Sequence, residues 1–111
     1  MDKKQLLGLI IESLDKLRIS HILCDHFKIG KTTQTLKDRF SENYEGEYDC
    51  IELLFDAGSN GALIDWLEKE MIQYCIEEYS KECDNEQVGG GPNCADNAST
   101  QNTAKLYVVF R

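Results

Sequence analysis

The sequence has little positive charge. Its 111 residues include 12 Lys and Arg against 20 Asp and Glu, which gives a formal net charge of −8. Nonspecific nucleic-acid binders are usually basic, because phosphate neutralisation supplies most of their affinity, so this balance argues against that class. The chain also lacks an apolar run long enough to cross a bilayer, and no small-residue cleavage pattern follows its short N-terminal apolar run. These absences predict one soluble, cytoplasmic domain with no membrane contact.

Cysteine pairs of the kind found in metal sites are also missing. The chain has five cysteines, an odd number, and no Cys-x-x-Cys spacing. Without a secretion signal a disulfide framework is not expected. His21, Cys24 and His26 lie close together, and Cys83 and Cys94 could join them, but zinc ligands usually show tighter paired spacing. We therefore expect ordinary reduced cysteines.

The hydrophobic pattern predicts a small mixed fold. Residues 86–104 are rich in Gly, Asn and Ser and predict a flexible loop that serves as a lid or as a connector. The apolar strand at 105–111 needs partners and must pair with the main body. We expect a single α+β domain over residues 1–111, with a three- to four-stranded antiparallel sheet flanked by three helices. The predicted strands are 21–24, 26–31, 48–55 and 105–111, and the predicted helices are 3–19 (within an N-terminal segment 1–20), 32–44 and 62–80.

Side chains that favour helix N-caps precede each predicted helix. Asp2 is the expected cap of the first helix, Thr32 or Thr33 of the second, and Ser59 or Asn60 of the third. The apolar stripe of the first helix predicts packing against the domain's own sheet in preference to a partner.

One acidic residue interrupts the apolar face of the third predicted helix. Glu68 lies between Ile64 and Ile72, four residues away on either side, so all three share that face. A carboxylate in an apolar stripe is costly unless it is paired or binds a cation. Glu68 is therefore the strongest candidate site residue, facing Arg39 across a small pocket; a purely structural pair with Arg39 is the alternative.

The order of these features resembles the GIY-YIG nuclease superfamily, in particular members with a Lys-Ile-Gly-Lys-Thr motif. The similarity extends over most of residues 26–91. Each motif is short, and the order and spacing of the motifs carry the resemblance. The matching segments are Phe27-Lys28-Ile29-Gly30-Lys31-Thr32, Leu36-Lys37-Asp38-Arg39-Phe40, Leu67-Glu68-Lys69-Glu70-Met71-Ile72 and a position near Asn85.

The resemblance implies a metal-dependent endonuclease acting on nucleic-acid phosphodiesters. Arg39 would contact the scissile phosphate, and Glu68 would hold one Mg²⁺ or Mn²⁺ ion. Asn85 would take the place of the family's asparagine, as a substrate contact, although it lies further from Glu68 than expected. The physical logic agrees, because a hard cation polarises the phosphate and arginine stabilises its charge through forked hydrogen bonds. Lys31 is the further catalytic candidate, and Lys28 and Lys37 complete a local basic patch as substrate contacts.

The chain departs from the family pattern at its tyrosines. The Gly-Ile-Tyr strand is missing before Lys28, and Lys28 itself replaces the tyrosine of the second motif. The family uses these tyrosines to position or deprotonate water. A circular permutation would supply the missing strand from the C-terminus and set Tyr107 beside Lys28 and Ile29. Tyr44 and His26 are weaker candidates for the base.

Two other functions fit parts of the sequence. A catalytically inactive relative, of the kind encoded by viruses or mobile elements, would use its acidic surface to bind a nucleic-acid enzyme as a protein partner. Gly30-Lys31-Thr32 superficially matches the end of a nucleotide-binding P-loop. The glycine required four residues before the Gly-Lys pair is missing, which argues against nucleotide binding of that type.

Overall fold

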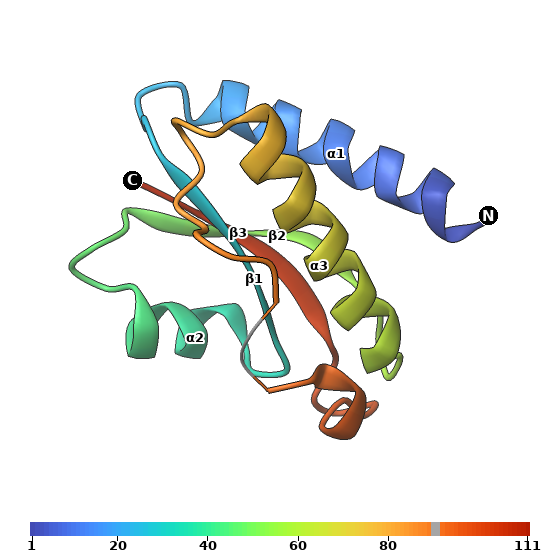
Figure 1. Ribbon diagram of the computed structural model, residues 1–111. Coiled ribbons are helices and arrows are strands. Elements are labelled where there is room, and N and C mark those ends of the chain that lie inside the picture. Colours follow the sequence, from blue (N-terminus) through green and yellow to red (C-terminus); the bar gives the residue numbers. More distant parts are fainter. Residues whose placement is uncertain (90–91) are drawn as a thin grey trace.

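The computed structural model describes residues 1–89 and 92–111, and it has the expected α+β architecture (Figure 1). Its three helices and its three-stranded antiparallel sheet confirm the predicted fold class. In chain order the elements are α1 (Lys3–Ser20), β1 (Phe27–Thr32), α2 (Leu36–Asn43), β2 (Cys50–Asp56), α3 (Gly61–Glu78), a 3₁₀ helix η1 (Cys94–Asp96) and β3 (Lys105–Phe110).

The C-terminal strand lies in the middle of the sheet. The strand order is β1-β3-β2, and both neighbours run antiparallel to β3. Tyr107 pairs with Gly30 on one side and with Leu53 on the other. The last strand therefore pairs with the Lys-Ile-Gly segment, as expected. Tyr107 lies opposite Gly30, one residue after the predicted neighbours Lys28 and Ile29. The two edge strands are β1 and β2.

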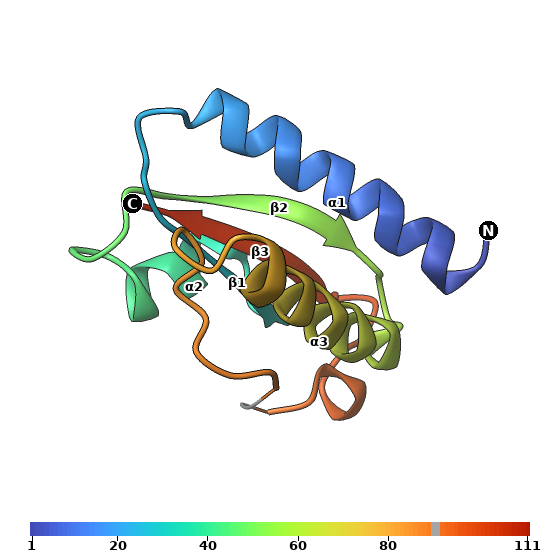
Figure 2. The same ribbon diagram turned by 45° about the horizontal axis from the view of Figure 1, so that its top comes forward.

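The helices form a layer on each face of the sheet. Figure 2 shows α1 and α3 on one side and α2 on the other. The larger core lies under α1 and α3 and includes Leu14, Leu67 and Val108, all fully buried. A smaller aromatic core lies under α2. It consists of Tyr44, Tyr48, Tyr107 and Val109, with Leu36, Phe40 and Ile51 packed against it.

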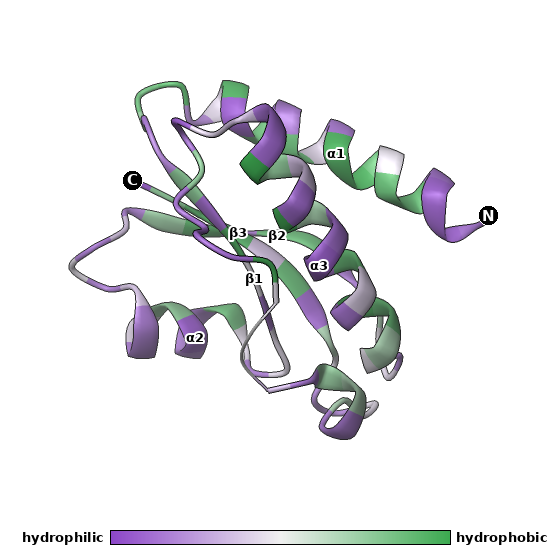
Figure 3. Cartoon of the chain, in the orientation of Figure 1, coloured by the Kyte–Doolittle hydropathy of each residue, from purple (hydrophilic) through white to green (hydrophobic). Residues whose placement is uncertain are grey.

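Hydrophobic and hydrophilic residues alternate along α1 and α3, as amphipathic helices require (Figure 3). The stripe predicted for α3 is correct, and Glu68 is buried within it at 7% exposure. Within residues 1–89 and 92–111 we find no helix with the length and apolar character to span a membrane.

Two predicted helix starts are confirmed and one is wrong. Asp2 caps α1 in a capping box with Gln5, and Asn60 caps α3 by accepting a hydrogen bond from the Leu63 N–H. In contrast, α2 is capped by Thr35 and not by Thr32 or Thr33. Thr32 stays in β1, because it still pairs with Lys105 of β3.

The strand predicted at residues 21–24 does not form. The His21 N–H donates to the Leu17 carbonyl, and the Cys24 N–H donates to the His21 carbonyl, so the chain leaves α1 through a turn. His21 stacks on Phe110 with ring centroids 4.5 Å apart. The segment therefore covers the end of the sheet without joining it, which leaves three strands.

The segment predicted as a flexible loop is partly docked on α3. Asp65 accepts hydrogen bonds from the N–H groups of Cys94 and Ala95 at the start of η1, at 2.8 and 3.0 Å. Gly61 permits this contact, because a Cβ there would overlap the Cys94 carbonyl. The described end of the loop is thus fixed to the helix that carries Glu68. Residues 90–91 of the predicted loop lie outside the described residues.

Candidate functional site

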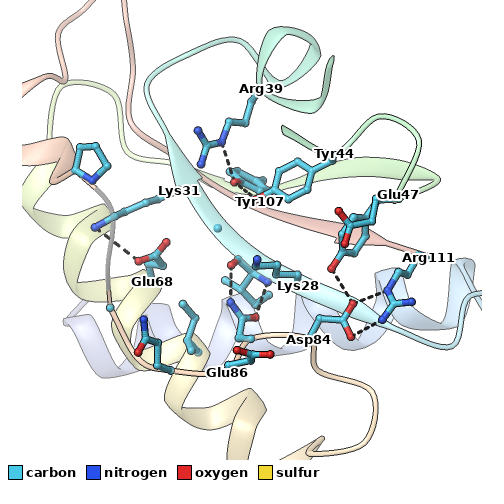
Figure 4. Close-up of a pocket in the computed structure, with 18 residues that line it drawn as sticks. Lys28, Lys31, Arg39, Tyr44, Glu47, Glu68, Asp84, Glu86, Tyr107 and Arg111 are labelled. Carbon is cyan, nitrogen blue, oxygen red and sulfur yellow. Dashed lines mark hydrogen bonds and ion pairs between the residues drawn. The ribbon is translucent and has the colours of Figure 1, made fainter. Parts of the chain in front are cut away.

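A pocket of about 680 Å³ lies along the free edge of β1 (Figure 4). The sheet edge divides its walls. Arg39 and Tyr107 approach from the α2 side, whereas Lys31 and Glu68 lie on the α3 side. The pocket gathers six of the predicted site residues, namely Lys28, Lys31, Arg39, Glu68, Asn85 and Tyr107.

Tyr107 is the centre of the α2 side of the pocket. Its ring lies against Gly30, where a Cβ would overlap the ring carbon Cζ and the hydroxyl oxygen. Arg39 Nε donates a hydrogen bond to Tyr107 Oη at 3.0 Å, and the hydroxyls of Tyr44 and Tyr107 are 2.7 Å apart. The Arg39 guanidinium therefore keeps its two terminal nitrogens for another acceptor, since no ion pair joins it to a carboxylate in the described part of the chain.

The protonation of this hydroxyl cluster is set mainly by burial. Burial, and then the neighbouring Tyr44 hydroxyl, raise the pKa of Tyr107, and the Arg39 charge opposes this only in part. Burial would lower the pKa of Arg39, but the contact with Tyr107 raises it above the ordinary value. At neutral pH the cluster therefore holds a neutral phenol beside a permanent positive charge.

On the α3 side, Lys31 lies between two carboxylates. Its Nζ donates to Asp65 Oδ1 at 3.0 Å and lies 3.6 Å from Glu68 Oε1. The lysine and Glu68 side chains are only 8% and 9% exposed. Asp65 was not predicted as a site residue. Its position three residues before Glu68, on the same face of the helix, was the sequence signal that would have found it.

The pKa values of the two carboxyl groups shift in opposite directions. Burial raises the pKa of Glu68 above 4.5, although the charges of Lys31 and Arg39 oppose it. Burial also disfavours ionised Asp65, but the hydrogen bonds from the Cys94 N–H and from Lys31 outweigh this and lower its pKa. Asp65 thus holds the lysine by a hydrogen bond, and Lys31 is the ion-pair partner of Glu68 in the described part of the chain.

Glu68 and Arg39 line the same pocket, as predicted, but the alternative of a direct pair between them is not found in the described part of the chain. The direct ionic partner of Glu68 is Lys31, and Arg39 acts on Glu68 only through its charge. The alternation of a β-strand explains the difference. Lys31 projects from β1 to the α3 face, whereas Arg39 reaches the pocket from α2, on the opposite face of the sheet.

Asn85 holds the outer edge of β1. Its Oδ1 accepts from the Ile29 N–H at 2.9 Å, and its Nδ2 donates to the Ile29 carbonyl at 3.0 Å. Two residues earlier in β1, the Phe27 N–H donates to the Glu82 carbonyl, and the Phe27 carbonyl accepts from the Asp84 N–H. Asn85 therefore lines the pocket with a side chain whose amide atoms already bind the strand, which is a structural role different from the predicted substrate contact.

The far end of the pocket is closed by a cluster around Asp84. Arg111 donates to it from Nε and Nη2 at 2.7 and 3.0 Å, and Tyr48 donates from its hydroxyl at 2.7 Å. Burial opposes ionisation of Asp84, but the Arg111 and Tyr48 hydrogen bonds lower its pKa. His26, a weaker candidate for the base, lies in this cluster, with its Nδ1 3.2 Å from Asp84 Oδ1 but without a hydrogen bond. The pairing with Asp84 neutralises the Arg111 charge.

The two remaining predicted substrate contacts, Lys28 and Lys37, lie in different places. Lys28 lines the pocket and is not paired with a carboxylate in the described part of the chain. Lys37 is exposed on α2 and does not line the pocket. The predicted basic patch is therefore split between the pocket and the outer surface of α2.

The carboxylate of Glu68 suits one hard divalent cation. No group of three or more His, Cys, Asp or Glu side chains within residues 1–89 and 92–111 is arranged as a metal cage. Mg²⁺, however, commonly binds through one or two carboxylates, with waters and phosphate oxygens as the other ligands. Glu68 is buried at the pocket wall and has Lys31 as its cationic neighbour, so a second cation would have to compete with that ammonium group.

No protein-family model matches the chain, and comparison with curated proteins and with solved structures gave no significant match. The interpretation of the pocket therefore depends on its own geometry.

Proposed function

We propose that the pocket is the active site of a divergent GIY-YIG-type endonuclease that hydrolyses nucleic-acid phosphodiesters with one Mg²⁺ or Mn²⁺ ion. The observation that carries this proposal is the convergence of Arg39, Tyr107, Lys31 and Glu68 on one pocket. These four residues come from four separate elements of the chain, β1, α2, α3 and β3, and the sequence resemblance assigns family roles to Arg39, Glu68 and Tyr107.

Each residue has a distinct part in the proposed hydrolysis. The terminal nitrogens of Arg39 bind the scissile phosphate and stabilise the charge that develops on its oxygens. Water attacks phosphorus, the bond to the leaving sugar oxygen breaks, and that oxygen leaves as an alcohol after it takes a proton from solvent water. Tyr107 orients the attacking water. Its phenolate form, which is a small fraction at neutral pH because burial raises the Tyr107 pKa, receives the proton of that water, and Tyr44 shares its hydroxyl contact.

Glu68 is the residue that would hold the cation, and the bound cation would supply Lewis-acid stabilisation of the phosphate and of the leaving oxygen. Lys31, anchored by Asp65, adds a fixed positive charge at the same wall. In this arrangement Asp65 positions Lys31 so that the lysine does not neutralise Glu68 completely.

A cleavage assay with matched variants tests the proposal. The wild type should cleave single-stranded DNA with Mg²⁺ or Mn²⁺ and not with EDTA, and Glu68→Gln should lose this cleavage while keeping the fold. Manganese titration followed by electron paramagnetic resonance should give weaker binding for Glu68→Gln than for the wild type. Lys81→Gln, an exposed change outside the pocket, is the control. Equal cleavage by the wild type and Glu68→Gln would reject the active-site assignment.

The second candidate function is a catalytically inactive acidic protein that binds a nucleic-acid enzyme. One observation favours it: Ile19, Ile22 and Leu23 at the end of α1 are 72%, 75% and 95% exposed, in a chain of net charge −8. An exposed apolar patch on an acidic protein is suited to a partner with a basic surface. Under this function, Leu23→Asp should abolish binding of the partner and Glu68→Gln should not, with no cleavage by any variant.

A further inference from the structure

We infer that the ligand of this pocket is a short single-stranded oligonucleotide, of which the pocket binds one phosphodiester, and that double-stranded DNA is not its substrate. This inference rests on the proposed function and names the substrate class of the same site. The observation that supports it is the arrangement of positive and negative side chains around the pocket.

Four cations line the pocket, but two of them are already neutralised. Lys31 is paired with Asp65 and Glu68, and Arg111 is paired with Asp84. Lys28 and Arg39 are the lining cations without a carboxylate partner in the described part of the chain. Two positive charges match the charge of one terminal phosphate or of at most two phosphodiesters, and not the many phosphates of a duplex.

The rim of the pocket is unfavourable to neighbouring phosphates. Glu47 and Glu86 are exposed residues that line it, and both are acidic. A double helix carries about one negative charge per 1.7 Å of its axis, so phosphates on both strands would lie near these carboxylates. The net charge of −8 adds a long-range repulsion that a long polyanion feels more strongly than a ligand with a single charge.

The size of the pocket supports the same conclusion. A volume of about 680 Å³ lies in the range of roughly 300–1,000 Å³ that is typical of pockets for small organic ligands. Specific protein–DNA complexes instead bury roughly 1,000–2,500 Å² of protein surface, usually strongly basic. The whole accessible surface of this chain is 6592 Å², and the lysine nearest to the site on α2, Lys37, lies outside the pocket.

The test compares three probes in EDTA, so that none is cleaved: a thymidine dinucleotide with one phosphodiester, a 12-nucleotide thymidine strand and a 12-base-pair duplex. Binding is measured by amide chemical shifts. The dinucleotide and the single strand should bind with dissociation constants within about tenfold, and log K should fall with log salt concentration with a slope near −1, as expected for one phosphate contact. Arg39→Ala should weaken binding of the dinucleotide at least about tenfold, which is the effect of losing about 1.4 kcal/mol, whereas Lys81→Gln should not change it.

The outcomes separate the inference from the proposed function. A duplex that binds more than about tenfold tighter than the dinucleotide, with a salt slope steeper than about −3, overturns the inference. So does the absence of binding of the dinucleotide at millimolar concentration. Neither result decides whether the protein cleaves DNA, which is measured separately with Mn²⁺. Conversely, a dinucleotide that binds at Arg39 but is not hydrolysed with Mn²⁺ supports the ligand class and rejects the nuclease.

Discussion

The ring of Tyr107 lies against Gly30, in the next strand of the sheet, where a side chain would not fit. The two residues are paired across β1 and β3, although they are 77 positions apart in the chain. The space left by the glycine lets the tyrosine hydroxyl reach Arg39 and Tyr44. The small residue of the Lys-Ile-Gly segment therefore shapes the candidate site without contributing any chemistry of its own.

Gly30→Ala should destabilise the protein and displace Tyr107. The added Cβ overlaps ring atoms within a packed core, and overpacking of this kind costs about 1–3 kcal/mol. Urea unfolding measures the loss, and the near-ultraviolet circular dichroism of tyrosine should change with it. Gly8→Ala is the matched control. A Cβ at Gly8 on α1 meets no atom within 4 Å, so this variant should gain about 0.5–1 kcal/mol from helix propensity. A Gly30→Ala protein as stable as the wild type would contradict the described contact.

Asn85→Ala should loosen the outer edge of β1. The change removes two hydrogen bonds and leaves the Ile29 N–H and carbonyl without their partner, at a cost of about 1–3 kcal/mol. Hydrogen exchange should show faster exchange at the Ile29 amide, with Val108 in the centre of the sheet less affected. Asn93→Ala is the control, because the Asn93 side chain makes no capping hydrogen bond. Unchanged exchange at Ile29 would be inconsistent with the two-point contact.

Glu68→Gln and Asp84→Asn should change stability with opposite dependence on pH. The folded pKa of Glu68 is raised, so the folded state binds the proton more tightly than the unfolded state, and wild-type stability falls as pH rises from 4.5 through the folded pKa. Glu68→Gln lacks this loss. The free energy of unfolding of Glu68→Gln minus that of the wild type should therefore increase as pH rises through that window.

Asp84 has the reverse sign. Its folded pKa is lowered, so its contribution is present above pH 3.8 and is lost as pH falls through the folded pKa. Asp84→Asn should therefore lose about 1–3 kcal/mol at neutral pH, because charged hydrogen bonds from Arg111 are weakened, and the loss should shrink in acid. Urea unfolding of the two variants and the wild type between pH 3 and pH 8 measures both profiles; parallel profiles would show that the stated burial and pairing do not control these groups.

Tyr107→Phe should lower the cleavage rate by about 10²–10⁴, the usual contribution of a positioned acid or base, with little change in binding of the dinucleotide. Tyr44→Phe should have a smaller effect, because the Arg39 contact to Tyr107 remains. Since burial raises the pKa of Tyr107 above 10.0, the wild-type rate should keep increasing as pH approaches 10 without a plateau. Single-turnover kinetics across this range provide the measurement. A plateau near neutral pH would assign the base to another group.

The features that were predicted correctly depend mostly on residues that are close together in the chain. The stripe of α3, the burial of Glu68, and the caps at Asp2 and Asn60 depend on neighbours within one or two helical turns, so they are visible in the sequence. The start of α2 was misplaced because Thr32 and Thr35 are equally good capping residues. The choice between them depends on the pairing of Thr32 with Lys105, which is a contact between distant segments.

The candidate site shows the same division. The sequence supplied Arg39, Glu68 and Lys31 and placed Glu68 and Arg39 at one pocket, but it did not predict Lys31 as the ionic partner of Glu68, because the face of the sheet on which a side chain projects is known only when the strand is placed. It gave no indication that Asn85 would be used by the Ile29 backbone. Asp65, which anchors both Lys31 and η1, was overlooked although it shares the face of Glu68.

The sequence by itself determined most of the elements, their amphipathic faces and the inventory of charges, because these follow from the short-range periodicity and composition of the chain. Only the tertiary structure decided that the last strand lies in the centre of the sheet, that Tyr107 fills the space beside Gly30, and that Lys28 and Arg39 are the unpaired cations of the pocket. The physical reason is that strand pairing and ion pairing join residues far apart in the chain, and their choice depends on the free energy of the whole packed sheet.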